Sequence, residues 1–116
     1  MTKIIIRKAK KSDLQTIQKL LSTYFLDMED LEPEDFLLYE VEGKITGCIS
    51  LIKTKLRGEN IMEIHSIAVH PNFRGKEIGT RLIKYILATV NDQACNLYVR
   101  TTVPGFFEKM NLSCRI

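Results

Sequence analysis

The sequence has few of the features that stabilise secreted or membrane-bound proteins. Its three cysteines, Cys48, Cys95 and Cys114, are an odd number and show neither CxxC nor another paired-ligand spacing. We therefore interpret them as reduced thiols in the core or in strands and expect no metal site. No apolar run approaches the length of a membrane span, and the N-terminus lacks the basic start and apolar stretch of a secretion signal. These absences predict a cytoplasmic protein with no membrane partner.

The chain also lacks a concentrated block of basic residues. Its net charge of +3 comes from 17 Lys and Arg against 14 Asp and Glu, spread along the chain without interleaved aromatic residues. Nucleic-acid-binding surfaces carry such clusters, so we expect no nucleic-acid partner. A small phosphorylated cofactor would suit the positive balance, and solubility alone would explain it equally well.

Glycine and proline are sparse as well, with 6 and 3 copies in 116 residues, and no repeat, low-complexity tract or linker interrupts the chain. A hydrophobic share of 45% and a charged share of 27% are typical of a soluble globular protein. Length and composition together predict a single domain, residues 1–116.

Hydrophobic periodicity predicts the order β α β β β α β α β. We expect a buried first strand from its β-branched Ile4–Ile6 run, and a first helix capped by Ser12 and Gln15 in the S-x-x-Q arrangement. The acidic stretch 27–35 should be irregular, with at most a turn or two of helix. The expected strands are 3–8, 36–41, 44–53, 61–69, 94–100 and 112–116, and the later helices are 78–90 and 104–110.

Two amphipathic patterns define expected faces. The first helix should bury an apolar stripe of Leu14, Ile17, Leu20, Leu21, Tyr24 and Phe25. In the fourth strand, strict alternation places Ile61, Glu63, His65, Ile67 and Val69 on one face and Met62, Ile64, Ser66 and Ala68 on the other.

Candidate chemistry concentrates in residues 63–80. A strand ends at Val69, and a loop containing Gly75 opens the following helix, where Arg74 and Lys76 add positive charge. A glycine-bearing loop at a helix N-terminus presents unpaired N–H groups and the positive end of the helix dipole, which suits a pyrophosphate. An ordinary strand-to-helix turn has the same spacing, so the pattern alone leaves both interpretations open.

The pattern V-x-P-x-F-R-G-x-x-I-G over residues 69–79 resembles the cofactor loop of the GNAT acetyltransferases, whose signature is Q/R-x-x-G-x-G/A. Arg74 and Gly79 match its first and last positions, and residues 6–14, 43–51 and 106–109 resemble other family segments. The resemblance implies an α+β (mixed α/β) fold with a central, mostly antiparallel, splayed sheet and helices on both faces, here without the family's last strand.

The same resemblance implies an N-acetyltransferase that takes an acetyl group from acetyl-CoA and transfers it to a primary amine by direct attack, without a metal. By this resemblance the cofactor-binding residues are Ile67, Ala68, Val69, Arg74, Gly75, Lys76, Glu77, Ile78, Gly79, Thr80 and Phe107.

Glu63 stands where many members of the family carry the glutamate that acts as general base, often through water. Without that resemblance, Glu63 reads as a solvent-exposed glutamate on a sheet face. His65 is an alternative base, although a lone strand histidine is more often structural. By analogy, the oxyanion donor would be the backbone N–H of Val69.

Two positions depart from the family pattern. Glu77 replaces the middle glycine of the signature; at positive φ it would be strained by about 1 kcal/mol and its carboxylate would repel phosphate. In an ordinary helical conformation it would instead suit the first turn. Phe107 replaces a tyrosine that protonates the leaving thiolate, which leaves Tyr98 or a water as alternative donors.

Phe107, with Thr101 and Thr102 and residues 45–48, makes the chain similar to the acetyltransferase domain of N-acetylglutamate synthases. That similarity implies a small, amino-acid-like amine, held by residues around Tyr24 and Phe25 and by Lys53 or Arg57. Three alternatives remain open: a peptide or protein amine, a catalytically degenerate CoA-binding or interaction module, and a homodimer formed through the C-terminal arm.

Overall fold

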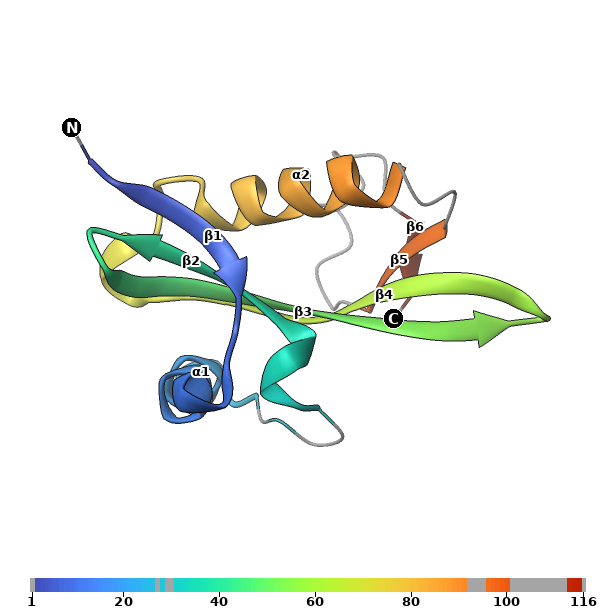
Figure 1. Cartoon of the computed structure of the whole chain (residues 1–116), viewed down its shortest axis with the longest axis horizontal. Helices are drawn as coiled ribbons and strands as arrows, with labels where there is room; N and C mark the ends of the chain where they lie inside the picture. The colour runs from blue at the N-terminus through green and yellow to red at the C-terminus, as the bar shows by residue number, and fades with distance from the viewer. Residues whose placement is uncertain (1, 27, 29–30, 92–95, 101–112, 116) are drawn as a thin grey trace.

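A computed structural model describes residues 2–26, 28, 31–91, 96–100 and 113–115 (Figure 1). Three short 3-10 helices, η1, η2 and η3, span Lys11–Asp13, Pro33–Asp35 and Pro71–Phe73. The strands and α-helices are β1 (Ile4–Lys8), α1 (Leu14–Ser22), β2 (Phe36–Val41), β3 (Lys44–Leu56), β4 (Glu59–Val69), α2 (Ile78–Asn91), β5 (Asn96–Arg100) and β6 (Ser113–Arg115).

One sheet has the strand order β1-β2-β3-β4-β5-β6. Strands β1 to β4 pair antiparallel, whereas β5 is parallel to β4 and β6 is parallel to β5. Helices α1 and α2 lie on opposite faces of the sheet (Figure 1). The predicted mixed α+β fold, with a mostly antiparallel sheet and helices on both faces, is confirmed.

Each helix packs against one face of the sheet and covers a separate hydrophobic core there. The core on the α2 face includes Ile49, Met62, Ile64, Ile78, Leu82, Ile83 and Ile86. The core on the α1 face includes Ile17, Leu20, Leu21, Phe36, Leu38, Cys48 and Ala68. Cys48 is a free thiol, as predicted, and burial raises its pKa to about 12. Among the described helices, none is both long and apolar enough to span a bilayer.

The prediction of a buried first strand is wrong. Ile4 is 43% exposed and Ile5 is 38% exposed. Strand β1 stands at the edge of the sheet and pairs only with β2, so a run of β-branched residues here reports strand propensity and not burial.

The start and end of the first helix also differ from prediction. Ser12 lies inside η1, and the carboxylate that accepts the capping N–H, from Lys10 at 2.7 Å, belongs to Asp13. Arg7 holds the same carboxylate through two hydrogen bonds of 2.9 and 3.0 Å, which the predicted serine cap could not offer. The helix ends at Ser22, so Phe25, at φ 60° and 98% exposed, is not part of the buried stripe.

A bulge in β4 overturns the predicted two faces of that strand. Ser66 lies opposite Ser50 and Ile64 lies opposite Leu51, which leaves His65 as an extra residue. The extra residue shifts the alternation by one. Ile67 and Val69 therefore pack on the α2 face, together with Met62 and Ile64. Glu63 lies between Met62 and Ile64 in the strand, so its side chain points to the opposite, α1 face.

The remaining boundaries agree with prediction or shift by a few residues. The hairpins between β2, β3 and β4 are confirmed; β3 extends three residues further than expected, and β4 begins at Glu59 instead of residue 61. Helix α2 matches its predicted start. Strand β5 is described over Asn96–Arg100, and residues 94–95 of its predicted range lie outside the described residues. The predicted helix 104–110, with Phe107, lies outside the described residues.

Candidate active site

The site begins where β4 separates from β5. Strand β5 pairs with β4 only from Ile61 to Ile64. Within the described residues, no strand pairs with the same edge of β4 beyond Ile64. The separation coincides with the bulge at His65. The second half of β4 therefore has one backbone edge that no described strand pairs with, which we call the open edge.

The register with β3 tells which backbone groups face this open edge. His70 donates its N–H to the carbonyl of Thr46 at 2.8 Å, which makes Val69 and Gly47 a pair that exchanges no hydrogen bonds with each other. The N–H and C=O of Val69 thus point away from β3. Ile67, two residues earlier, is oriented in the same way.

The first turn of α2 packs directly over these two residues. A Cβ at Gly79 would lie 3.5 Å from Ile67 Cδ1 and 3.9 Å from Val69 Cγ2, which is ordinary contact. A Cβ at Gly47 would lie 2.9 Å from Ile78 Cγ2, so a glycine in β3 is what allows the helix to approach so closely. The side chain of Ile78 is buried in the core, which leaves only its backbone for a ligand.

The loop before α2 forms a cradle of backbone N–H groups. The first intrahelical bond runs from the N–H of Arg81 to the carbonyl of Glu77, at 2.9 Å. The N–H groups of Ile78, Gly79 and Thr80 therefore have no acceptor within the helix. They lie at the positive end of the helix dipole, beside the open edge of β4, where an anionic group would be stabilised.

Of the two conformations considered for Glu77, positive φ and ordinary helical, the structure has the strained, positive-φ one. Its φ is 62°, close to the 77° of Gly75, and its side chain is exposed. The loop thus keeps the left-handed backbone that a glycine would adopt readily, at a cost of about 1 kcal/mol.

Arg74 is held beside the cradle by Tyr24. Its Nε donates to the Tyr24 hydroxyl at 2.9 Å, and its guanidinium carbon lies 4.8 Å from the centre of the tyrosine ring. The same hydroxyl donates to the carbonyl of Val69. The terminal nitrogens of Arg74 remain available to a ligand, because only Nε has a hydrogen bond among the described residues.

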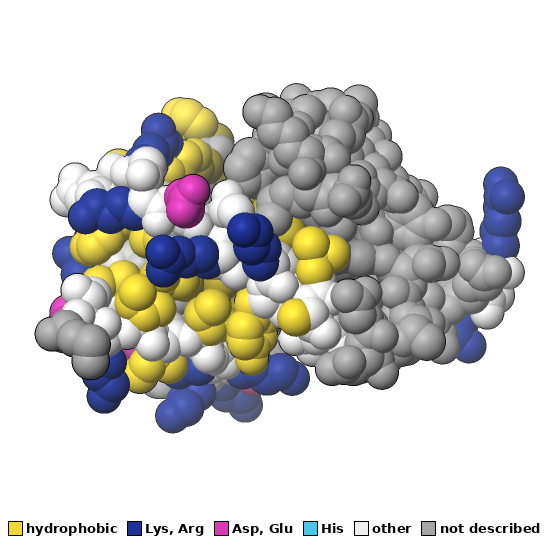
Figure 2. Space-filling view, turned by 90° about the horizontal axis from the view of Figure 1, so that it is seen from above, with side chains coloured by type: hydrophobic (Ala, Val, Ile, Leu, Met, Phe, Trp, Pro, Cys, Tyr) yellow, Lys and Arg dark blue, Asp and Glu magenta, His cyan; other side chains and the backbone are white. Residues whose placement is uncertain are grey.

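Lysines surround an aromatic ring on the same side. Lys44 and Lys76 each place Nζ 5.6 Å from the centre of the Phe73 ring, and His70 packs edge-on against that ring at 5.9 Å. His70 is half-buried, and its Nδ1 accepts the N–H of Asn72. Lys and Arg side chains also dominate the charged groups on the described part of the face seen from above in Figure 2. This positive surface suits a phosphorylated ligand.

Glu63 lies on the α1 side of the sheet and is only 7% exposed. It interacts with its surroundings and is paired with Tyr98 in the register of β5. His65, the bulge residue, is half-buried and places Nδ1 3.1 Å from the Ser66 hydroxyl. A buried carboxylate therefore faces one side of the sheet, while the cradle lies on the other.

The residues expected to contact an acceptor are not all close together. Tyr24 is at the cradle, and Phe25 beside it is exposed. Lys53 and Arg57 lie in the long arm of β3 and β4, about 20 Å and about 33 Å along the strands from Val69. No metal-binding group of His, Cys, Asp or Glu occurs among the described residues.

Two contributors to the site were not assigned from the sequence. The bond of Tyr24 to Val69 joins residues 45 positions apart and leaves no local pattern. Gly47 has a signal, because a glycine inside a strand marks a bulge or a close approach of another segment.

Comparison with known proteins supports the interpretation of this geometry. Residues 5–111 match the acetyltransferase (GNAT) family. The chain belongs to that family. It is an acetyl-CoA-dependent N-acetyltransferase of the GNAT type, as its cofactor loop predicted.

Individual relatives are distant. The chain is 26% identical over 115 residues to an uncharacterized N-acetyltransferase of Chlorobaculum tepidum, covering 90% of this chain and 72% of that protein. It is 28% identical over 118 residues to an amino-acid acetyltransferase of Mycobacterium tuberculosis, covering 90% of this chain and 66% of the relative.

Among solved structures, N-acetylglutamate synthase of Neisseria gonorrhoeae, complexed with coenzyme A and N-acetyl-glutamate, has the same fold. The TM-score is 0.77 at 20% identity, over 93% of this GNAT chain and 28% of the synthase chain. The GNAT chain thus spans just over a quarter of that enzyme.

Proposed function

We propose that this GNAT acetyltransferase transfers the acetyl group of acetyl-CoA to the primary amine of a small, amino-acid-like substrate, with Glu63 as general base. The observation that carries the proposal is the separation of β4 from β5 at His65, with the first turn of α2 packed over the exposed backbone of Ile67 and Val69. Acetyl-CoA supplies an activated thioester, and the chain supplies binding, orientation and proton transfer.

The cradle before α2 fits the pyrophosphate of the cosubstrate. The N–H groups of Ile78, Gly79 and Thr80, together with those of Gly75 and Lys76, offer donors, and Arg74 adds a formal charge held in place by Tyr24. Charge-assisted bonds from a fixed guanidinium to phosphate are among the stronger hydrogen bonds in proteins. The backbone of Ala68, between the two exposed residues, pairs with Cys48 and supports this edge.

The open edge of β4 fits the acyl arm. Amide groups of an extended arm can pair with the N–H and C=O of Ile67 and with the N–H of Val69, whose carbonyl already accepts a hydrogen bond from Tyr24. Ile67 is four residues from Glu63, about 13 Å along the strand, whereas Val69 is about 20 Å away. The shorter span favours the N–H of Ile67 over that of Val69 as the oxyanion donor.

We infer that Glu63 receives a proton from the amine. It lies on the α1 face, opposite the α2 face that carries the cradle, so amine and cosubstrate approach from opposite sides of the sheet. The amine forms a bond to the acetyl carbon, the carbon–sulfur bond breaks, and the ammonium proton passes to Glu63 directly or through water. The departing thiolate takes a proton from solvent or from a hydroxyl near the edge.

The acceptor class rests on relatives. The chain is similar in sequence to an amino-acid acetyltransferase and in fold to a synthase bound to N-acetyl-glutamate, which supports an amine that also carries a carboxylate. A peptide or protein amine is the competing acceptor. Turnover of acetyl-CoA with free amino acids and with short peptides, measured in parallel, separates the two.

The catalytic assignment is tested by Glu63→Gln. We expect turnover to fall at least a hundredfold while coenzyme A affinity stays within twofold, because the amide keeps the shape of the site but accepts no proton. Glu34→Gln, at an exposed glutamate on η2, is the matched control and should retain activity. Unchanged turnover of Glu63→Gln at every pH would reject Glu63 as the base.

A second candidate is a module that binds coenzyme A without catalysing transfer. The departures from the family pattern at Glu77 and Phe107 favour it. Tight cofactor binding without turnover on any amine would establish this alternative. A single-domain organisation over residues 1–116, a homodimer through the C-terminal arm, and a cytoplasmic location remain predictions.

A further inference from the structure

Strand β3 has an unpaired edge in a part of the molecule away from the cradle. The pairing of β2 with β3 ends at Phe36 and Ser50, but β3 continues to Leu56. Among the described residues, no segment pairs with that side of β3 beyond Ser50. The backbone N–H and C=O of Ile49 point toward β2, and backbone groups of alternate residues point to the same edge of a strand. The N–H and C=O groups of Lys53 and Lys55 therefore also point to this edge, where β2 no longer lies.

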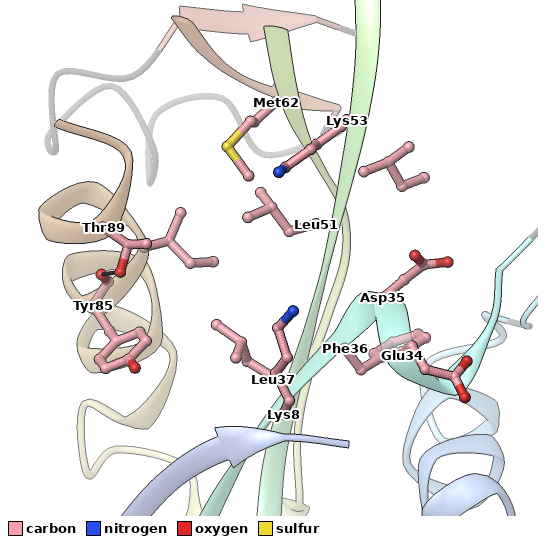
Figure 3. A pocket seen from close by; sticks show the side chains of 12 residues that line it. Lys8, Glu34, Asp35, Phe36, Leu37, Leu51, Lys53, Met62, Tyr85 and Thr89 are labelled. Carbon is pink, nitrogen blue, oxygen red and sulfur yellow. Dashed lines mark hydrogen bonds between the residues drawn. The ribbon is translucent and has the colours of Figure 1, made fainter. Parts of the chain in front are cut away.

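A cavity of about 520 Å³ lies along the same edge (Figure 3). It opens between α2 and η2, at the point where β2 begins. Leu37, Leu51 and Met62 form an apolar floor on the α2 side, and the amines of Lys8 and Lys53 extend over that floor. A cavity of this size is within the range that binds ligands.

The charges on the two sides of the edge differ. On the α2 side, Lys8 and Lys53 have no ion-pair partner within the described part of the chain. On the other side, η2 contributes Glu34, which is exposed, and Asp35. Alternate side chains of a strand added here would point to opposite faces of the sheet. One set would face the lysines on the α2 side, and the other set would face the carboxylates of η2.

Pairing of two copies of this chain through this edge is unfavourable. In an antiparallel pair, outward-facing residues lie opposite one another, and those of β3 are Leu51, Lys53 and Lys55. The register that pairs all three residues places Lys53 directly opposite Lys53 of the other copy, and like charges directly opposite are destabilising. The edge is therefore suited to a partner of different charge.

We propose that the β3 edge over residues 51–56 is a docking site for an extended segment of another protein, which adds as a strand next to β3. The side chains of that segment that face α2 carry carboxylates, opposite Lys53 and Lys55, and those that face η2 are basic or uncharged. Backbone hydrogen bonds to β3 supply affinity, and the alternating charge supplies selectivity. The site lies about 20 Å along the strands from Val69, so docking leaves the cradle accessible.

Fluorescence anisotropy with two labelled peptides of eight residues tests the proposal. One alternates Thr and Glu, and the other alternates Thr and Lys. We expect the Glu peptide to bind at least tenfold more tightly than the Lys peptide. The double variant Lys53→Glu, Lys55→Glu should reverse this preference, while Lys84→Glu, an exposed charge on the outer face of α2, should not.

A third peptide separates strand pairing from simple charge attraction. It is the Glu peptide with every second backbone nitrogen methylated. Two versions are made, one with the odd-numbered and one with the even-numbered nitrogens methylated. In one of them every N–H that would donate to β3 is blocked. We expect that version to lose binding at least tenfold. Hydrogen exchange should show the Lys53 and Lys55 amides protected by the unmethylated peptide and by the other methylated version, but not by this one. Equal binding of the Glu and Lys peptides, or full binding of both methylated versions, would overturn the proposal. Retained coenzyme A affinity verifies that each variant is folded.

Discussion

The Tyr24 hydroxyl is hydrogen-bonded to the carbonyl oxygen of Val69, which joins the end of α1 to the end of β4. The same hydroxyl accepts a hydrogen bond from Arg74. One side chain from the α1 face thus positions the arginine of the cofactor loop next to the open backbone of β4. This arrangement links the side of the sheet where we place the amine with the side where we place the pyrophosphate.

Tyr24→Phe should therefore weaken coenzyme A binding about fivefold, because about 1 kcal/mol of hydrogen bonding no longer holds Arg74 in place. Isothermal titration measures the change. Tyr85→Phe removes an exposed hydroxyl from α2 and is the matched control, with unchanged affinity expected. If both variants bind coenzyme A as the wild type does, Tyr24 does not position Arg74.

Glu77→Gly should strengthen coenzyme A binding about fivefold, because Glu77 is exposed in the loop that leads into α2 and its negative charge costs about 1 kcal/mol of repulsion toward phosphate. The free energy of unfolding should change little, since relief of the positive φ is offset by the flexibility of glycine in the unfolded chain. The gain in affinity should shrink as salt concentration rises.

Glu42→Gly provides the control for that change. Glu42 is also a glutamate at positive φ, 52°, but it lies in the turn between β2 and β3. It should gain no affinity for coenzyme A. An affinity increase of the same size in both variants would show that overall charge, and not the cradle, is responsible.

The capping carboxylate of Asp13 predicts a pH dependence of stability. Its hydrogen bonds with Arg7 hold the pKa of Asp13 below its ordinary value of 3.8. A lowered pKa in the folded state means that the ionised carboxylate stabilises the protein above that ordinary value, and that this contribution is lost as pH falls through the folded-state pKa.

Asp13→Asn should therefore lower the free energy of unfolding by about 1–2 kcal/mol at neutral pH, and by progressively less below about pH 4. Urea denaturation at several pH values measures the difference. Asp35→Asn removes a carboxylate that caps η2 through Glu32 and, among the described residues, has no arginine partner, so its effect should be smaller. A difference between wild type and Asp13→Asn that stays constant with pH would contradict this account.

Local patterns predicted the hairpins of β2 to β4, the helix α2 and the loop between β4 and α2, because hydrophobic period and turn residues specify these elements directly. The faces of β4 were not predictable in the same way. The bulge at His65 carries no glycine to mark it, and one extra residue reverses which side chains face which core.

Contacts between distant segments account for the other differences. Asp13 displaced Ser12 as the capping residue because Arg7, on a neighbouring strand, binds its carboxylate. Helix periodicity likewise included Phe25 in a buried stripe, although the chain leaves the helix after Ser22. Such outcomes depend on tertiary partners that local sequence patterns do not specify.

The central claim is that Arg74 and the first turn of α2 bind the phosphates of acetyl-CoA. Isothermal titration of acetyl-CoA into the wild type, Arg74→Ala and Lys84→Ala tests it most directly. We predict micromolar binding to the wild type, at least a tenfold loss in Arg74→Ala and no change in Lys84→Ala, whose lysine is exposed on α2 away from its first turn. Undiminished binding to Arg74→Ala, or no binding to the wild type, would contradict the proposed site.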